Sequence, residues 1–125
     1  MLKMYVDAGK KGIGLCVKDS IEWSLVLPWY ESYTREEVPF GTYNEGELRA
    51  IEYGLKTCLA LNIKEVELYS DSKIARIYFY GLNKKQTKIN LLNIQTKIFL
   101  LKKHFDYVAV KYIKGKDNPA DILTK

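Results

Sequence analysis

Hydrophobic and polar residues alternate over residues 3–8, which is the pattern of a strand with one buried face. Asp7 lies near the end of this strand and is followed by a glycine-containing turn. The apolar segments 13–18 and 21–27 are separated by a short turn, so we expect an antiparallel meander of three strands. Residues 28–39 carry two prolines among aromatic and acidic side chains. We expect an irregular connection there, whose aromatics serve packing or, alternatively, base stacking.

A helical pattern follows from Asn44 to Leu61, with Thr42 or Asn44 as its N-cap. Glu47 lies at the edge of the apolar stripe and is expected to lean toward the sheet, unlike Glu45 and Glu52. The stripe recurs at spacings of three and four and consists of Leu48, Ile51, Leu55, Cys58 and Leu59.

Alternation returns over residues 64–69, just before Asp71. A strand, a helix and a strand joined by short connections favour a right-handed crossover between parallel neighbours. Asp7 and Asp71 are then expected to emerge together at the carboxyl ends of adjacent strands, where open α/β sheets place their sites.

The remaining chain predicts two helices, a last strand and a closing helix. Ser72 is the expected N-cap of a short helix that ends at Gly81. Residues 86–104 keep a helical spacing, and residues 107–113 form a strand. Pro119 suits the first position of a closing helix that contains Asp121. The 125 residues fit a single α/β domain, 1–125.

Composition indicates a globular protein, with 47% hydrophobic and 28% charged residues. No apolar run approaches the roughly 18 to 20 residues that span a bilayer, and the N-terminus lacks the apolar region of a signal peptide. We therefore expect an intracellular, cytoplasmic monomer without membrane contact. Cys16 and Cys58 lie far apart in apolar surroundings, which favours reduced thiols over a disulfide or a metal cage.

The net charge of +5 is concentrated in one stretch. Residues 84–103 contain six lysines and no acid, which suits the phosphates of a polyanion. A solvated helix face is the alternative explanation.

Four acids stand at element ends or on an inward face. Carboxylates gathered at one place repel each other unless a cation neutralises them, and Mg²⁺ prefers such oxygen ligands. Each acid taken singly is more often a cap or a solvated turn residue. The four are Asp7, Glu47, Asp71 and Asp121.

The segments that carry these acids resemble, in the same order, the four motifs of type 1 ribonuclease H. The motifs are Tyr5 to Gly9, Asn44 to Leu48, Tyr69 to Ser72, and Asn118 to Leu123. The ending from Ala120 to Lys125 also resembles ribonuclease H domains attached to reverse transcriptases of retrotransposons.

This resemblance implies a mixed five-stranded sheet with helices on both faces and a site for two Mg²⁺ ions, which Mn²⁺ can replace. It implies that Asp7, Glu47 and Asp71 hold the ion that activates water and that Asp121 helps to hold the second ion. The implied activity is hydrolysis of the RNA strand of RNA–DNA hybrids.

Contacts to the hybrid are also implied. Asn44 matches an asparagine that touches the minor groove, and the backbone at Ala8 and Gly9 is placed to read 2′-hydroxyls. Further substrate contacts are expected from Ser72, Lys84, Lys85 and Lys88.

Two departures from the family pattern stand out. The family usually has a histidine in the loop before the last aspartate, and Lys116 is the nearest replacement here. A lysine is a poor proton shuttle at neutral pH, so we expect slowed catalysis. Only four residues follow Asp121, so the closing helix is about one turn long.

Two alternatives remain open. One is a ribonuclease H-like module that binds nucleic acid or a polymerase partner, such as a reverse transcriptase domain, without cutting. The other is a resolvase or transposase of the same superfamily, against which the helix-borne Glu47 argues. An active enzyme with so few substrate handles is also expected to gain from a polymerase partner.

Overall fold

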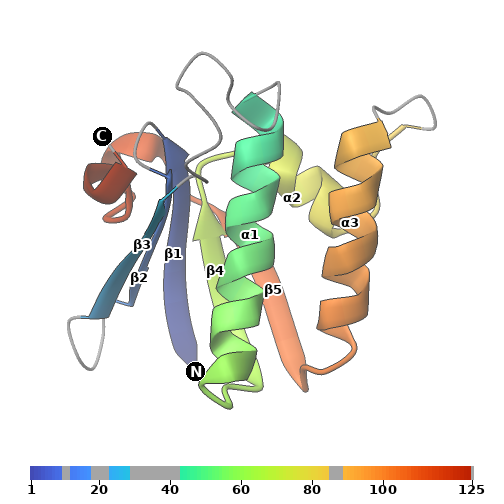
Figure 1. Ribbon diagram of the computed structural model, residues 1–125, viewed down its shortest axis with the longest axis horizontal. Coiled ribbons are helices and arrows are strands. Elements are labelled where there is room, and N and C mark those ends of the chain that lie inside the picture. Colours follow the sequence, from blue (N-terminus) through green and yellow to red (C-terminus); the bar gives the residue numbers. More distant parts are fainter. Residues whose placement is uncertain (10–11, 18–22, 29–42, 85–88, 125) are drawn as a thin grey trace.

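The computed structural model describes residues 1–9, 12–17, 23–28, 43–84 and 89–124. Its centre is one mixed sheet of five strands in the order β3-β2-β1-β4-β5, with helices packed beside it (Figure 1). The strands are β1 (Leu2–Gly9), β2 (Gly12–Val17), β3 (Trp23–Pro28), β4 (Glu65–Ser70) and β5 (Tyr107–Tyr112). The helices are α1 (Tyr43–Ala60), α2 (Lys73–Phe79) and α3 (Ile89–Lys102), with 3-10 helices η1 (Gly115–Asp117) and η2 (Asp121–Thr124).

Strand directions follow the predicted pattern. β1 pairs antiparallel with β2, and β2 pairs antiparallel with β3, which confirms the meander. β1 and β4 pair in parallel, as do β4 and β5. The carboxyl ends of these three parallel strands therefore meet at one edge of the sheet, close to the first turn of α1 (Figure 1).

The three α-helices cover one face of the sheet (Figure 1). α1 packs directly on the central strands, because its apolar stripe fits the side chains that β1 and β4 present on that face. Asn62 takes a left-handed φ of 59° and ends α1 within a residue of the predicted position. The buried core that joins α1 to these strands includes Met4, Val6, Leu48, Ile51, Leu55 and Leu68.

The opposite face carries less helix than expected. Residues on β1 alternate between the two faces, so Asp7 and its β2 neighbour Gly14 point away from α1. A Cβ atom added at Gly14 would meet Leu123 and Thr124, which places η2 against this face. Among the described residues, the helix on this face is the one-turn 3-10 helix η2. The prediction of helices on both faces is therefore met only in part.

The closing element also begins later than predicted. Pro119 is not its first residue, because η2 starts at Asp121. Asn118 makes the turn instead, since its side-chain oxygen accepts a hydrogen bond from the backbone N–H of Ala120. The chain then closes in a tight 3-10 turn rather than an α-helix.

The other boundaries agree with the pattern to within about two residues where they fall in the described part of the chain. Ser72 caps α2, as predicted, by accepting a hydrogen bond from Ala75 N–H. Cys16 and Cys58 are free cysteines, and Cys58 is buried. Within the described residues, none of the helices has the length and apolar character needed to cross a membrane. The irregular connection predicted for 28–39 lies outside the described residues, apart from Pro28 in β3.

Candidate active site

Three aspartates from distant parts of the chain meet at the carboxyl edge of the sheet. Asp7 is near the end of β1, Asp71 directly follows β4, and Asp121 opens η2. One carboxylate oxygen from each lies within 4.8 Å of the others. Asp7 is buried, whereas Asp71 and Asp121 are half-buried. Two of the three carboxylates in this acidic cluster therefore stay partly accessible to solvent.

Glu47 reaches the same region from α1. Its side chain is completely buried, although its carboxylate is not one of the three that group within 4.8 Å. The charges of Asp7 and Asp71 act on it, so the carboxylate lies beside the acidic cluster. The sequence-based expectation that Glu47 leans inward is met.

Burial makes these acids hard to charge. It raises the pKa of Asp7 to about 6, a shift that the Thr124 hydrogen bond opposes and the charge on Asp71 increases. Burial also raises the pKa of Glu47 to about 9, with further contributions from Asp7 and Asp71. The pKa of Asp71 is raised by its own burial and then by the charge on Asp121. Burial is the largest cause of each shift, because a charged carboxylate loses its hydration there.

Three buried carboxylate oxygens of these acids are unsatisfied. Within the described residues, no hydrogen-bond partner contacts Asp7 Oδ1 or either carboxylate oxygen of Glu47, although all three atoms are buried. Buried polar atoms normally have partners, because an unpaired one costs about 1–3 kcal/mol or more. Divalent cations with a preference for oxygen ligands would satisfy these atoms and neutralise the repulsion. The donor set therefore fits Mg²⁺ or Mn²⁺.

The loop with Lys116 lies next to the acidic cluster. A Cβ atom added at its neighbour Gly115 would come within 3.1 Å of Asp71 Oδ2, so the chain passes close to this aspartate. Lys116 itself is exposed on η1. The structure thus places an exposed lysine one residue after a glycine whose backbone passes close to Asp71.

The residues expected to contact substrate have different surroundings. Asn44 is half-buried in the first turn of α1, and Ala8 and Gly9 end β1 beside Asp7. Ser72 Oγ accepts the hydrogen bond from Ala75 N–H that caps α2. Its hydroxyl proton can still be donated to another partner. Lys84 is exposed, whereas Lys85 and Lys88 lie outside the described residues.

The lysines of α3 do not all face solvent. Lys97 on α3 is exposed, as is Lys103, which directly follows the helix. Lys102 instead donates a hydrogen bond of 3.0 Å to the carbonyl oxygen of Phe79, at the end of α2, and lies 4.1 Å from the centre of the Phe79 ring. Its pKa is lowered by burial. Lys102 therefore ties α3 to α2 rather than belonging to a charged surface.

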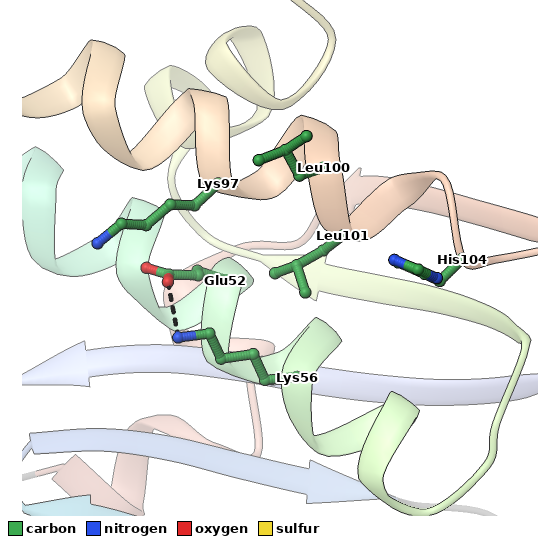
Figure 2. A pocket seen from close by; sticks show the side chains of 6 residues that line it. All are labelled: Glu52, Lys56, Lys97, Leu100, Leu101 and His104. Atoms are coloured by element: carbon green, nitrogen blue, oxygen red, sulfur yellow. Dashed lines mark ion pairs between the residues drawn. The ribbon is translucent and has the colours of Figure 1, made fainter.

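A hollow between α1 and α3 holds another buried acid, Glu52 (Figure 2). Glu52 pairs with Lys56 at 3.0 Å, and Lys97 extends toward it from α3 (Figure 2). Glu45 also turns to α3, where it accepts a hydrogen bond of 3.1 Å from Asn90. Glu45 and Glu52 do not face the sheet, as expected, but both are buried, which the helical pattern did not indicate.

Two buried polar residues near the acidic cluster had no role assigned from the sequence. Asn118 and Thr124 make hydrogen bonds to β1 and lie on either side of Asp121 in sequence. Glycines within strands often mark a place where another part of the chain comes close. Gly9 and Gly14 are the sequence signal that could have indicated such an approach here.

The sheet order, the crossover and the acidic edge define the ribonuclease H-like class of folds. The chain is similar to ribonuclease H1 from the halophilic archaeon Halobacterium salinarum NRC-1, with a TM-score of 0.75 and 16% identity over 98% of this chain and 92% of that chain. It is similar to the N-terminal RNase H domain of Rv2228c from Mycobacterium tuberculosis, with a TM-score of 0.74 and 18% identity over 98% and 95% of the two chains. It is also similar to LC11-RNase H1 in complex with an RNA/DNA hybrid, with a TM-score of 0.72 and 21% identity over 98% and 93%.

Sequence comparison then gives the family. The pattern of the reverse transcriptase-like family matches residues 32–125, which is more than half of the chain. The protein belongs to this family, which is ribonuclease H-like, and the resemblance seen in its sequence is confirmed. No curated protein matches the sequence significantly.

Proposed function

We propose that the protein is a Mg²⁺-dependent endonuclease that hydrolyses the RNA strand of RNA–DNA hybrids. The observation that carries this proposal is the meeting of Asp7, Asp71 and Asp121 within 4.8 Å, beside the buried and unpartnered carboxylate of Glu47. A neighbour of the same fold, LC11-RNase H1, was solved with an RNA/DNA hybrid. The family and this acidic cluster together favour a nuclease over a passive binding domain.

The acidic residues have separate tasks in this proposal. Asp7, Glu47 and Asp71 would hold one cation, and Asp121 would help to hold a second. When bound, the cations would supply an activated water and stabilise the leaving oxygen of the phosphodiester. Mn²⁺ is expected to substitute, because it also takes oxygen ligands.

Other residues orient the hybrid. Asn44 touches the minor groove from the start of α1, and the backbone at Ala8 and Gly9 meets 2′-hydroxyls, which distinguish RNA from DNA. Ser72 and Lys84 contact the phosphate backbone, together with Lys85 and Lys88. Lys116 contacts phosphate near Asp71 and transfers protons poorly.

We further propose that the protein acts as a monomer beside a polymerase domain. The match to the reverse transcriptase-like family supports such a partner. A tethered partner raises the effective concentration of hybrid at the acidic cluster without new contacts.

The test is cleavage of an end-labelled hybrid in Mg²⁺ and in Mn²⁺, with duplex RNA and duplex DNA as parallel substrates. Asp71→Asn is the informative variant, because it removes one charge from the acidic cluster and keeps the side-chain shape. Asp106→Asn is the matched control, since Asp106 is exposed beside the amino end of β5. We expect RNA cleavage only in the hybrid, its loss in Asp71→Asn and its retention in Asp106→Asn.

Undiminished cleavage by Asp71→Asn would show that the site is misassigned. Binding of the hybrid without cleavage by the unmodified protein would favour a binding module, for which the replacement of the family histidine by Lys116 is the motivating feature. Cleavage of duplex DNA instead would favour another nuclease of the superfamily.

A further inference from the structure

Asp121 belongs to a segment with little secondary structure of its own. η2 contains four residues, and a helix this short does not hold a side chain in place by itself. Two buried side chains, three residues before and three residues after Asp121, attach this segment to β1. They are Asn118 and Thr124, exposed by only 4% and 3%.

Asn118 fixes the chain as it enters η2. Its side-chain nitrogen donates a hydrogen bond of 3.0 Å to the carbonyl oxygen of Val6, the residue before Asp7. Its side-chain oxygen accepts a hydrogen bond of 3.0 Å from the N–H of Ala120, the residue before Asp121. One amide thus joins the backbones that carry two of the acids.

Thr124 makes the corresponding link at the end of η2. Its hydroxyl lies 2.9 Å from Asp7 Oδ2 and donates to it, and it lies 3.1 Å from the carbonyl oxygen of Asp121. This contact occupies one oxygen of Asp7, while Oδ1 has no hydrogen-bond partner among the described residues. Thr124 therefore holds the Asp7 carboxylate in one orientation and leaves the other oxygen for a cation.

Two glycines make this approach possible. A Cβ atom added at Gly9 would lie 2.7 Å from the Thr124 hydroxyl oxygen, and one added at Gly14 would lie 2.9 Å from Thr124 Cγ2. Both distances are shorter than any relaxed contact, so β1 and β2 need glycine here to admit the threonine. Thr124 therefore fits the sheet by close packing against two glycines, in addition to its hydrogen bond to Asp7.

We propose that Asn118 and Thr124 form a C-terminal clamp that sets the spacing of Asp7 and Asp121 in the acidic cluster. Thr124 is the residue that acts on a carboxylate directly, and Asn118 positions the backbone. The proposal rests on the proposed function, since it assigns the clamp to the same cation site.

The clamp has a measurable consequence for cation binding. Groups that orient metal ligands by hydrogen bonds typically change metal affinity or activity by about 10- to 100-fold when they are removed. Thr124→Val keeps the branched shape and removes the hydroxyl, so we expect Mn²⁺ to bind about 10-fold more weakly. Thr124→Ser keeps the hydroxyl and should bind within about twofold of the unmodified chain, well short of that loss.

The experiment is calorimetric titration of the full chain with Mn²⁺ alone, together with kcat and KM on a labelled hybrid. Thr96→Val is the matched control, because the Thr96 hydroxyl also donates a hydrogen bond, of 3.0 Å to Leu92, but at an exposed position on α3. We expect Thr124→Val to weaken Mn²⁺ binding and to lower kcat with little change in KM. Thr96→Val should change neither.

The clamp is wrong if Thr124→Val binds Mn²⁺ as tightly as the unmodified chain, or if Thr124→Ser is as weak as Thr124→Val. If Thr124→Val does not fold, as judged by circular dichroism in chelator, Thr124→Ala removes the hydroxyl with less bulk and is compared with Thr124→Ser in the same way. Weaker Mn²⁺ binding in Thr124→Val, combined with no hybrid cleavage by any form, would retain the clamp and reject the proposed nuclease.

Discussion

Asp7 on β1 and Glu47 on α1 place two carboxylates beside each other in a buried part of the protein, and the charge on Asp7 raises the pKa of Glu47. Their pKa values rise to about 6 and about 9, mainly through burial. An acid whose pKa is higher in the folded protein holds its proton longer there than in the unfolded chain. Raising the pH through that interval therefore destabilises the fold.

We expect the metal-free protein to lose stability as the pH rises from about 5 to 9. Deprotonation of Asp7 accounts for the loss of stability up to about pH 6. Deprotonation of Glu47 accounts for the loss up to about pH 9. The loss should reach at least about 2 kcal/mol, since each unit of pKa shift corresponds to about 1.4 kcal/mol. Urea unfolding in chelator at several pH values measures it. Constant or rising stability over this interval would contradict the assignment, and added Mn²⁺ should reduce the slope by stabilising the charged forms.

Glu47→Gln should separate stability from activity. With a pKa of about 9, Glu47 must take up a proton when the chain folds at pH 8, and a neutral amide avoids this cost. The metal-free variant should therefore be about 1–3 kcal/mol more stable than the unmodified protein at pH 8. Hybrid cleavage should be lost, because a cation ligand is gone. Glu65→Gln, at an exposed position in β4, should stay within about 0.5 kcal/mol and keep its activity. Lower stability of Glu47→Gln at pH 8 would indicate that the charged carboxylate has a partner in the fold.

Gly14→Ala should displace η2. The new methyl group would lie 2.9 Å from Thr124 Cγ2 and 3.0 Å from Leu123 Cβ. Overpacking of this kind costs about 1–3 kcal/mol, and the shift of Asp121 should lower kcat about 10-fold or more. Adding Thr124→Ser removes one of the two clashing carbons and should recover part of the loss. Full activity of Gly14→Ala would show that η2 tolerates movement.

Lys116→His should raise the cleavage rate. The Lys116 loop lies beside Asp71, and a histidine there carries a proton reversibly at neutral pH. General acid–base assistance contributes about 10²–10⁴-fold in favourable geometry, so even a poorly placed imidazole should give a several-fold increase in kcat. Single-turnover kinetics on a labelled hybrid provides the measurement, with Lys114→His as the control on the same loop. Equal rates for the unmodified chain and Lys116→His would reject the argument about proton transfer.

Lys102 and Lys97 should respond oppositely to substitution. Lys102→Met removes the hydrogen bond to Phe79 and should cost about 1 kcal/mol of stability without changing hybrid affinity. Lys97→Ala should leave stability unchanged and weaken hybrid binding. It should also reduce the slope of the logarithm of the binding constant against the logarithm of the salt concentration by about 1. Binding titrations at several salt concentrations distinguish the two. A salt effect of Lys102→Met equal to that of Lys97→Ala would place both lysines on the binding surface.

The order of elements and the positions of three aspartates were accessible from the sequence alone. Alternation over β1 and β4 and the helical spacing in α1 are local patterns, because burial of one face repeats with the period of each element. The crossover rule then brought Asp7 and Asp71 to the same edge without knowledge of side-chain contacts. Glu47 could be assigned to an inward face for the same reason.

Only the tertiary structure decided how the acids are held and which other charges are buried. Thr124 contacts Asp7 across 117 residues of chain, and Asn118 contacts Val6 across 112. Glu52 is buried in the hollow between α1 and α3. Lys102 donates a hydrogen bond to the last residue of α2 instead of extending into solvent. Such contacts depend on how whole elements pack, and no periodicity within one element records them. The sequence therefore indicated which acids lie near one another, while packing between distant segments decided their spacing and their pKa values.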